Sequence, residues 1–265
     1  MTVRLLARPA RSGGLASTAE KTRETGRETD ASPEPGLIPR RLPHIPGLEV
    51  EAGVLLVLEA PPRAGGDFVD VFALDGAYCI AYGDICGNDP EVATLATMSK
   101  QTLRALAQRD PSPESVAHEL GRTLFLKFGG QRTLSLVYAC YDPASRRLAF
   151  SNCGAWPPML LTSRHARLFE ECGPRLGEHE FWRYPVVDLT LTPGEVFVGY
   201  TDGIPEARRG REILGIGPIQ HTLEHHPRDS APTLARRLLR LASEYARGPT
   251  MDDAVVVVAR ALTAA

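Results

Sequence analysis

Several short strand-like segments follow one another between residues 133 and 203, and turns such as the Asp-Pro-Ala-Ser-Arg of residues 142–146 join neighbouring ones. Turns this short cannot hold the crossover helix that two parallel neighbours require, so they predict antiparallel pairing. A chain with this feature has to build most of its core from antiparallel sheet. The segments are TLSLVYACYD, RRLAFSN, PMLLTS, YPVVDLTL and EVFVGYTDG.

Further strands and two groups of helices lie on either side of this stretch. Two strand-like segments flank Asp75-Gly76, a dipeptide that is a strong signal for a β-hairpin. Apolar residues recur at helical spacing before and after the central strands, and the final segment DDAVVVVARAL is typical of a strand buried on both faces. Because strands separate the helices, we expect an α+β fold in which helical layers flank two mostly antiparallel sheets. The expected helices are 91–110, 112–128 and 231–248, and the expected additional strands are 48–60, 67–74, 77–84 and 252–262.

The first 36 residues differ in composition from the rest of the chain. They are polar and charged, as in STAEKTRETGRETDASPEPG, and show no apolar period. Such a segment cannot bury enough apolar surface to offset the entropy that is lost on ordering. We therefore expect residues 1–36 to form a disordered tail, and regulation to come from outside the chain, for example from a separate regulatory protein.

The overall composition excludes several classes of protein. Hydrophobic residues make up 43% and charged residues 23% of the 265 residues, which is ordinary for a globular protein. The formal net charge of −2 gives no general attraction to nucleic acid or to anionic lipid. No apolar run approaches the length of about 20 residues that spans a bilayer, and the N-terminal apolar patch is too short for a signal peptide. We therefore expect no nucleic-acid partner, no membrane partner and a cytoplasmic location.

Four aspartates lie where an apolar strand begins or ends, and three of them touch a glycine. Taken singly, each has the ordinary interpretation of a turn residue that caps local N–H groups. Taken together, several strand-end carboxylates at one edge of a sandwich would repel one another unless cations lay between them. Ligands that are all oxygens select Mg²⁺ or Mn²⁺ over zinc. The four are Asp67 in GGDF, Asp84 in YGDICG, Asp202 in GYTDG and Asp252 in TMDDAV.

A pair of such ions points to the hydrolysis of phosphate esters. Two ions about 3.5 to 4 Å apart share a water, lower its pKa and present hydroxide to a phosphorus centre, so no protein nucleophile is required. This agrees with the absence of a G-x-S-x-G elbow, a C-x5-R loop or a Walker sequence. Cys86 would be the nucleophile of a thiol phosphatase, but no phosphate-cradling loop with an arginine follows it. We expect all five cysteines to be reduced, mostly buried and dispensable for chemistry.

The acidic motifs also have an order and a spacing that resemble those of a known family. GGDFVDVF, GDICGND, SNCGAWPPMLL, GYTDGIPEAR and DDAVVVVAR are similar to motifs of the stage II sporulation protein E-like branch of the metal-dependent protein phosphatases, the type 2C fold. The resemblance covers about residues 37–262. It implies one phosphatase domain over that range, an α-β-β-α sandwich, a centre of two Mn²⁺ or Mg²⁺ ions, and hydrolysis of phosphoserine or phosphothreonine. Because family members typically act on small anti-anti-sigma factors in bacterial partner-switching pathways, the implied partner is a phosphorylated protein of that kind.

Carried over to this chain, the resemblance implies a role for each acid. Asp84 resembles the carboxylate that bridges both ions, and the carbonyl of Ile85 resembles the backbone ligand of one of them. Asp202 and Asp252 resemble the remaining ligands of the other ion. Asp67 resembles the acid of the first motif, which binds or orients water on the second ion. These five residues are the implied metal ligands, and Asp67 and Asp84 are the implied catalytic residues.

Other positions of the same motifs either support this site or depart from the family pattern. Asp70 and Asp253, the second acids of their motifs, are expected to have supporting roles only, since an exposed turn or a hydrogen bond to a ligand explains either one. Asp89 stands where relatives often have glycine, Ala155 where they have the histidine of NAGH, and Val255 where they usually have threonine. None of the three replaces an implied metal ligand, so we expect an active enzyme.

Two other functions stay open from the sequence. A pseudophosphatase would bind a partner-switching protein as a scaffold without turnover, although crowded carboxylates would then destabilise an empty site for no gain. A metal-dependent phosphohydrolase for small molecules would share the chemistry and differ only in the surroundings of the site. The segment 91–106 matches the switching helix of this phosphatase branch by position, but its apolar stripe is more typical of plain core packing.

Overall fold

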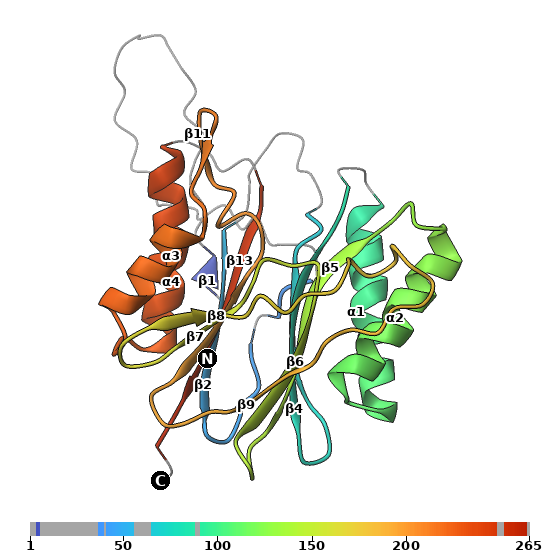
Figure 1. Ribbon diagram of the computed structural model, residues 1–265, viewed down its shortest axis with the longest axis horizontal. Coiled ribbons are helices and arrows are strands. Elements are labelled where there is room, and N and C mark those ends of the chain that lie inside the picture. The colour runs from blue at the N-terminus through green and yellow to red at the C-terminus, as the bar shows by residue number, and fades with distance from the viewer. Residues whose placement is uncertain are drawn as a thin grey trace, which may run out of the picture.

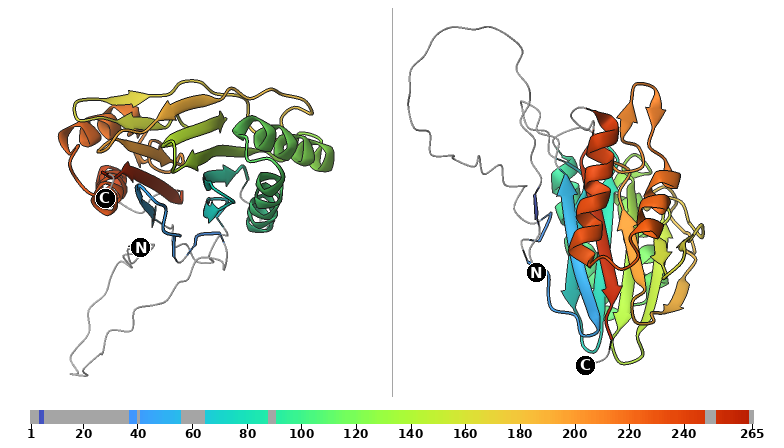
Figure 2. Two further views of the ribbon diagram at one scale, coloured as in Figure 1. Left: turned by 90° about the horizontal axis from the view of Figure 1, so that it is seen from below. Right: turned by 90° about the vertical axis from the view of Figure 1, so that its left-hand side faces the viewer.

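The chain folds into two facing β-sheets with helices on both outer sides (Figures 1 and 2). The computed structural model describes residues 4–5, 37–39, 41–55, 65–87, 91–247 and 252–263. None of the helices in these ranges is long and apolar enough to cross a membrane. The layers confirm the expected α+β fold, an α-β-β-α sandwich.

The first sheet has six strands in the order β1-β2-β13-β10-β7-β8. All neighbours in it pair antiparallel except β1, which runs parallel to β2. β13 lies between β2 and β10, and its residues from Ala254 to Ala259 are all buried, as predicted for a strand covered on both faces. The strands are β1 (Arg4–Leu5), β2 (Leu48–Leu55), β7 (Met159–Leu161), β8 (Ala166–Leu168), β10 (Val196–Tyr200) and β13 (Ala254–Ala261).

The second sheet has five strands in the order β3-β4-β5-β6-β9, and every neighbour in it pairs antiparallel. The hairpin predicted from Asp75-Gly76 is confirmed: β3 pairs with β4, and Gly76 in the turn has a φ of 75°. A separate two-stranded ribbon consists of β11 (Arg208–Arg209) and β12 (Glu212–Ile213). The strands of the five-stranded sheet are β3 (Phe68–Ala73), β4 (Tyr78–Ile85), β5 (Leu134–Asp142), β6 (Arg147–Cys153) and β9 (Val187–Thr190).

Two pairs of helices cover the outer faces of the sheets. α1 (Val92–Arg109) and α2 (Pro113–Phe128) pack on the five-stranded sheet, whereas α3 (Ile216–His225) and α4 (Ala231–Ala246) pack on the six-stranded sheet (Figure 1). α2 begins at a proline, whose fixed φ suits the first helical position, and ends at Gly129, which has a left-handed φ of 58°. Each helix buries one apolar face, and this face corresponds to the helical spacing of apolar residues in the sequence.

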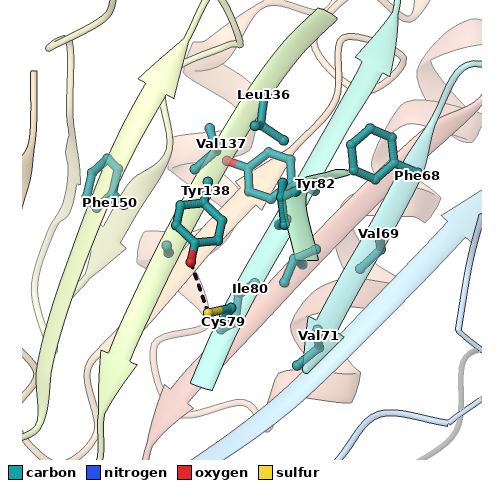
Figure 3. Close-up of a cluster of buried hydrophobic side chains, with 14 of the residues drawn as sticks. Phe68, Val69, Val71, Cys79, Ile80, Tyr82, Leu136, Val137, Tyr138 and Phe150 are labelled. Atoms are coloured by element: carbon teal, nitrogen blue, oxygen red, sulfur yellow. Dashed lines mark hydrogen bonds between the residues drawn. The ribbon is translucent and has the colours of Figure 1, made fainter. Parts of the chain in front are cut away.

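Large aromatic side chains are buried on both faces of the five-stranded sheet, among them Phe68, Tyr82, Tyr138 and Phe150 (Figure 3). Tyr82 and Phe150 face β10 of the other sheet, whereas the hydroxyl of Tyr138 donates to the carbonyl of Pro111, between α1 and α2. The hydroxyl of Tyr138 and Sγ of Cys79 form a hydrogen bond of 3.0 Å across neighbouring strands (Figure 3). Burying a side chain of this size stabilises a fold by about 1.5 to 3 kcal/mol. A second apolar cluster lies between the six-stranded sheet and helices α3 and α4.

Some expectations differ from the structure or fall outside the described residues. Most of the expected tail lies outside them, and within it only Arg4–Leu5 is described, as the strand beside β2. The expectation of mostly buried cysteines is wrong, because Cys79 and Cys153 are buried, whereas the other three are half-buried or exposed. Cys172 is exposed because it lies in a loop between two strands. All five cysteines are free, as expected.

Candidate metal centre and active site

Asp67 and Asp84 are brought side by side by the register of the β3–β4 hairpin. Phe68 of β3 pairs with Gly83 of β4, so the next position outward places Asp67 opposite Asp84. Asp67 is 5% exposed and Asp84 is half-buried. The two acidic motifs that flank the hairpin in the sequence therefore meet at its open end.

The six-stranded sheet contributes Asp202, which follows β10 after a single residue. One carboxylate oxygen from each of Asp67, Asp84 and Asp202 lies within 4.8 Å of the other two. We call these three residues the aspartate cluster. Because it takes residues from both sheets, the cluster exists only where the two sheets face each other.

Asp252 lies close to the aspartate cluster but outside it. It precedes β13, the neighbour of β10, and is exposed. Its charge raises the pKa of both Asp84 and Asp202, so it is within electrostatic reach of them. Among the described acids, its carboxylate is not one of those within 4.8 Å of one another. Asp252 as a metal ligand therefore stays a prediction.

Burial and mutual repulsion dominate the electrostatics of the aspartate cluster. Burial, followed by the charges of Asp84 and Asp202, raises the pKa of Asp67 well above its ordinary value. Burial and then the charge of Asp202 raise the pKa of Asp84 to about 8. Burial and then the charge of Asp252 raise the pKa of Asp202 to about 6. At neutral pH Asp84 would hold a proton unless a cation displaced it, whereas Asp202, which has the lower pKa, would be mostly ionised.

The donor atoms at this place suit a hard divalent cation. The aspartate cluster offers only oxygens, which Mg²⁺ and Mn²⁺ prefer. Gly66 lets the backbone approach Asp84 and one further oxygen donor, since a Cβ there would lie 2.4 Å from Oδ1 of Asp84 and 2.6 Å from the carbonyl oxygen of Ile85. The carbonyl of Ile85 is thus beside the carboxylate that the family resemblance pairs it with. The residues present fit Mn²⁺ or Mg²⁺.

Thr201 belongs to the site and is absent from the sequence prediction. Its hydroxyl donates a hydrogen bond of 2.8 Å to Oδ2 of Asp67 and accepts one of 2.9 Å from the backbone N–H of Val255. The backbone N–H of Thr201 also donates to the carbonyl of Val255 at 3.0 Å. Thr201 therefore ties the first acidic motif to the six-stranded sheet. Its position directly before Asp202 in GYTDG is the signal that could have identified it.

The two supporting acids have different surroundings. Asp70 is fully buried and accepts hydrogen bonds of 2.5 and 2.6 Å from Arg104 of α1, with the ammonium of Lys100 at 3.6 Å. It therefore links β3 to α1 and does not join the aspartate cluster. Asp253 is close enough to the aspartate cluster for its charge to contribute to the raised pKa of Asp67.

A small cavity next to the aspartate cluster contains a basic residue that the sequence prediction missed. Its volume is about 50 Å³, and it is lined by residues from both sheets and from the loop before Leu176, among them Arg175, Asp202, Thr201, Glu206, Trp156 and Gly154. The positive charge of Arg175 lowers the pKa of both Asp84 and Asp202. Arg175 lies in CGPRLG, a loop without periodicity, so only its flanking glycines hint at a close packing role.

The three departures from the family pattern lie in different places. Val255 is fully buried in β13 and keeps its backbone bonds to Thr201, so a threonine side chain is not needed to hold this strand. Ala155 is held by hydrogen bonds of 3.0 and 3.1 Å between its backbone and the side chain of Asn152. Asp89 lies outside the described residues.

The fold and the site agree with known proteins. The chain is 21% identical to the phosphoserine phosphatase RsbU of Bacillus subtilis over 88% of its own length and 69% of that protein. It superposes on the RsbU and RsbW domains of Rv1364c from Mycobacterium tuberculosis with a TM-score of 0.72 and 23% identity, covering 84% of this chain and 62% of that one. It also superposes on the catalytic domain of the serine/threonine phosphatase PstP, solved with two manganese ions, with a TM-score of 0.60 and 16% identity over 82% of this chain and 99% of that one.

The family assignment rests on a match to a family model. The model of the family Stage II sporulation protein E (SpoIIE) matches residues 74–262, which include β4, both helical pairs and the last strand. The match spans more than half of the chain and contains Asp84, Asp202 and Asp252, while Asp67 lies just before it. The fold is that of solved PP2C phosphatase domains. The chain belongs to the Stage II sporulation protein E (SpoIIE) family.

Proposed function

We propose that this protein removes phosphate from phosphoserine or phosphothreonine of a protein substrate, with the help of two Mn²⁺ or Mg²⁺ ions. The observation that supports this most directly is the aspartate cluster, in which three carboxylates from two sheets lie within 4.8 Å of one another. Such a group is unfavourable unless cations neutralise it. Relatives of the same fold have been solved with two manganese ions and with magnesium.

The chain's own residues divide the work in a definite way. Asp67, Asp84 and Asp202 would hold the ions, and the carbonyl of Ile85 and the carboxylate of Asp252 would complete the set of donors. When bound, a pair of such ions lowers the pKa of water and polarises a phosphoryl group. No residue of the chain has to act as a nucleophile in this chemistry.

Thr201 orients the carboxylate of Asp67. Its hydroxyl donates a hydrogen bond to Oδ2 of Asp67, and the remaining lone pairs of the carboxylate can still accept a cation or a proton. The charge of Asp84 adds to the raised pKa of Asp67, so the two carboxyls titrate as an interacting pair. The loaded site needs both carboxyls deprotonated.

For the substrate, we propose a phosphorylated anti-anti-sigma factor of a partner-switching pathway. The support comes from the relatives: one is named a phosphoserine phosphatase RsbU, and another is a chain that joins RsbU and RsbW domains. A separate regulatory protein and a cytoplasmic location stay predictions.

The test compares two substrates and one pair of variants. With Mn²⁺, the protein should hydrolyse p-nitrophenyl phosphate slowly and release phosphate from a phosphorylated anti-anti-sigma protein much faster. Asp202→Asn should abolish both activities, because it removes a charge that would hold the ions. Asp75→Asn, in the exposed hairpin turn, is the matched control and should leave both unchanged.

Each alternative function has its own outcome in this test. Turnover of the small ester alone would favour a small-molecule phosphohydrolase. Tight binding of the phosphoprotein without release of phosphate would favour a scaffold. Near wild-type turnover by Asp202→Asn at saturating Mn²⁺ would refute the site itself.

A further inference from the structure

The backbone around Arg175 is fixed on both sides. The N–H of Gly173 donates a hydrogen bond of 2.9 Å to the carbonyl of Asn152 at the end of β6. Leu176 and Leu134, the first residue of β5, exchange two backbone hydrogen bonds of 2.9 and 3.0 Å. Arg175 lies between these two attachments. A side chain that starts from so constrained a backbone is preorganised for a fixed partner.

The aliphatic part of the Arg175 side chain occupies space that is open only because residue 154 is a glycine. Gly154 has a left-handed φ of 73°, and a Cβ there would lie 2.4 Å from Cγ and 2.9 Å from Cα of Arg175. The far end of the side chain could move away, but the Cα of Arg175 could not. The glycine of SNCGAW and the arginine of CGPRLG therefore depend on each other, although they are separate in the sequence.

Arg175 lies next to the aspartate cluster without forming an ion pair with it. Arg175 lines the cavity of about 50 Å³ together with Asp202, and its charge acts on Asp84 and Asp202. Other arginines, such as Arg104 and Arg147, bond a carboxylate directly, whereas no carboxylate of the described residues lies within 4.0 Å of Arg175. An arginine that only balanced negative charge would gain most by direct contact. The N–H donors of Arg175 are thus left for another anion.

We propose that Arg175 binds the phosphoryl group of the substrate, with its guanidinium on one side of the cavity and the aspartate cluster on the other. Guanidinium matches phosphate oxygens by two parallel N–H···O bonds, which an ammonium cannot reproduce. The ligand class is a phosphate monoester dianion, and its product is inorganic phosphate. This assignment rests on the proposed phosphatase function, and it adds a substrate-binding residue to it.

The test is based on the opposite effects that the loss of Arg175 should have on the binding of phosphate and of Mn²⁺. Inorganic phosphate is titrated calorimetrically into Mn²⁺-loaded protein, and Mn²⁺ is titrated separately into metal-free protein. In Arg175→Gln, phosphate should bind about 10-fold to 100-fold more weakly, because a charge-assisted contact is lost. Mn²⁺ should bind equally well or more tightly, because a positive charge beside the carboxylates is gone. The KM for a phosphopeptide should rise in parallel with the loss of phosphate affinity.

Two further variants separate the charge from the geometry. Arg175→Lys keeps the charge and should recover only part of the phosphate affinity. Gly154→Ala leaves Arg175 in the sequence but displaces it, so it should weaken phosphate binding without weakening Mn²⁺ binding. Arg164→Gln, at an exposed turn between β7 and β8, is the matched control and should bind both ions like the wild type.

The outcomes that overturn this assignment differ from those that overturn the function. If Arg175→Gln weakens Mn²⁺ and phosphate binding together, Arg175 has a structural role, and the assignment fails. It also fails if phosphate binding is unchanged while the wild type is an active phosphatase. If the wild type binds Mn²⁺ but hydrolyses neither ester nor phosphoprotein, the proposed function fails, whatever Arg175 does.

Discussion

Replacing Asp84 with asparagine should stabilise the metal-free protein at alkaline pH and do little at acidic pH. The pKa of Asp84 is raised from 3.8 to about 8, mainly by burial and then by the charge of Asp202. Between these two values the folded state holds more protons than the unfolded state. The free energy of unfolding of the metal-free protein should therefore fall as pH rises through this window.

The magnitude follows from the size of the shift. One pKa unit corresponds to about 1.4 kcal/mol, so Asp84 alone would lower the free energy of unfolding by about 5 kcal/mol on going from pH 4 to pH 8. This is an upper limit, because Asp84 and Asp67 titrate as an interacting pair. Asp202, with a pKa raised to about 6, contributes in the same direction below that pH. Asparagine at position 84 cannot ionise, so the part of the slope that comes from Asp84 should disappear, whereas Asp67 and Asp202 keep theirs.

The assay is urea unfolding in EDTA at pH 5, 6.5 and 8, for the wild type, Asp84→Asn and the control Asp75→Asn. The wild type and Asp75→Asn should lose several kcal/mol between pH 5 and pH 8, and Asp84→Asn should lose much less. When Mn²⁺ replaces EDTA at pH 8, the free energy of unfolding of the wild type should rise, and that of Asp84→Asn should not. Equal slopes for the wild type and Asp84→Asn would refute the reasoning, and so would a wild-type stability that does not depend on pH.

Three other substitutions test the surroundings of the site. Thr201→Val removes the hydrogen bond to Asp67 and leaves the buried N–H of Val255 unpaired. It should destabilise the fold by about 1 to 3 kcal/mol and weaken Mn²⁺ binding in calorimetry. Thr201→Ser keeps the hydroxyl and should have neither effect. Asp70→Asn should cost about 3 kcal/mol in urea unfolding, because Arg104 loses its buried partner, yet leave the Mn²⁺ affinity within about twofold. Cys86→Ser should retain most phosphatase activity; loss of turnover with Mn²⁺ still bound would show that the thiol takes part.

The sequence predicts those parts of the molecule that have a local signal. The period of residues 91–110 and the turn at Asp75-Gly76 specify α1 and the β3–β4 hairpin, since both depend on neighbours in the chain. β8, β11 and β12 have only two or three residues each, too few for alternation to show. These strands form because longer strands or a tight turn hold them in place.

The candidate site likewise has residues that the sequence predicts and residues that it does not. Aspartates beside glycines at strand ends indicate an acidic site, and the structure brings Asp67, Asp84 and Asp202 together. The bond from Thr201 to Asp67 crosses between the sheets, and Arg175 reaches the site from a loop. Contacts of this kind depend on how the sheets face each other, and no periodic pattern encodes that.

The division of the aspartate cluster between two sheets also has a consequence for the order in which the protein folds. Asp67 and Asp84 can meet as soon as their hairpin forms, because they are neighbours in a local structure. Asp202 joins them only after the six-stranded sheet has docked, and that sheet needs β13 between β2 and β10. The cation-binding place therefore cannot close before β13 has joined the six-stranded sheet. A partly folded chain that has only the hairpin lacks one carboxylate of the aspartate cluster, so the site forms together with the docking of the two sheets.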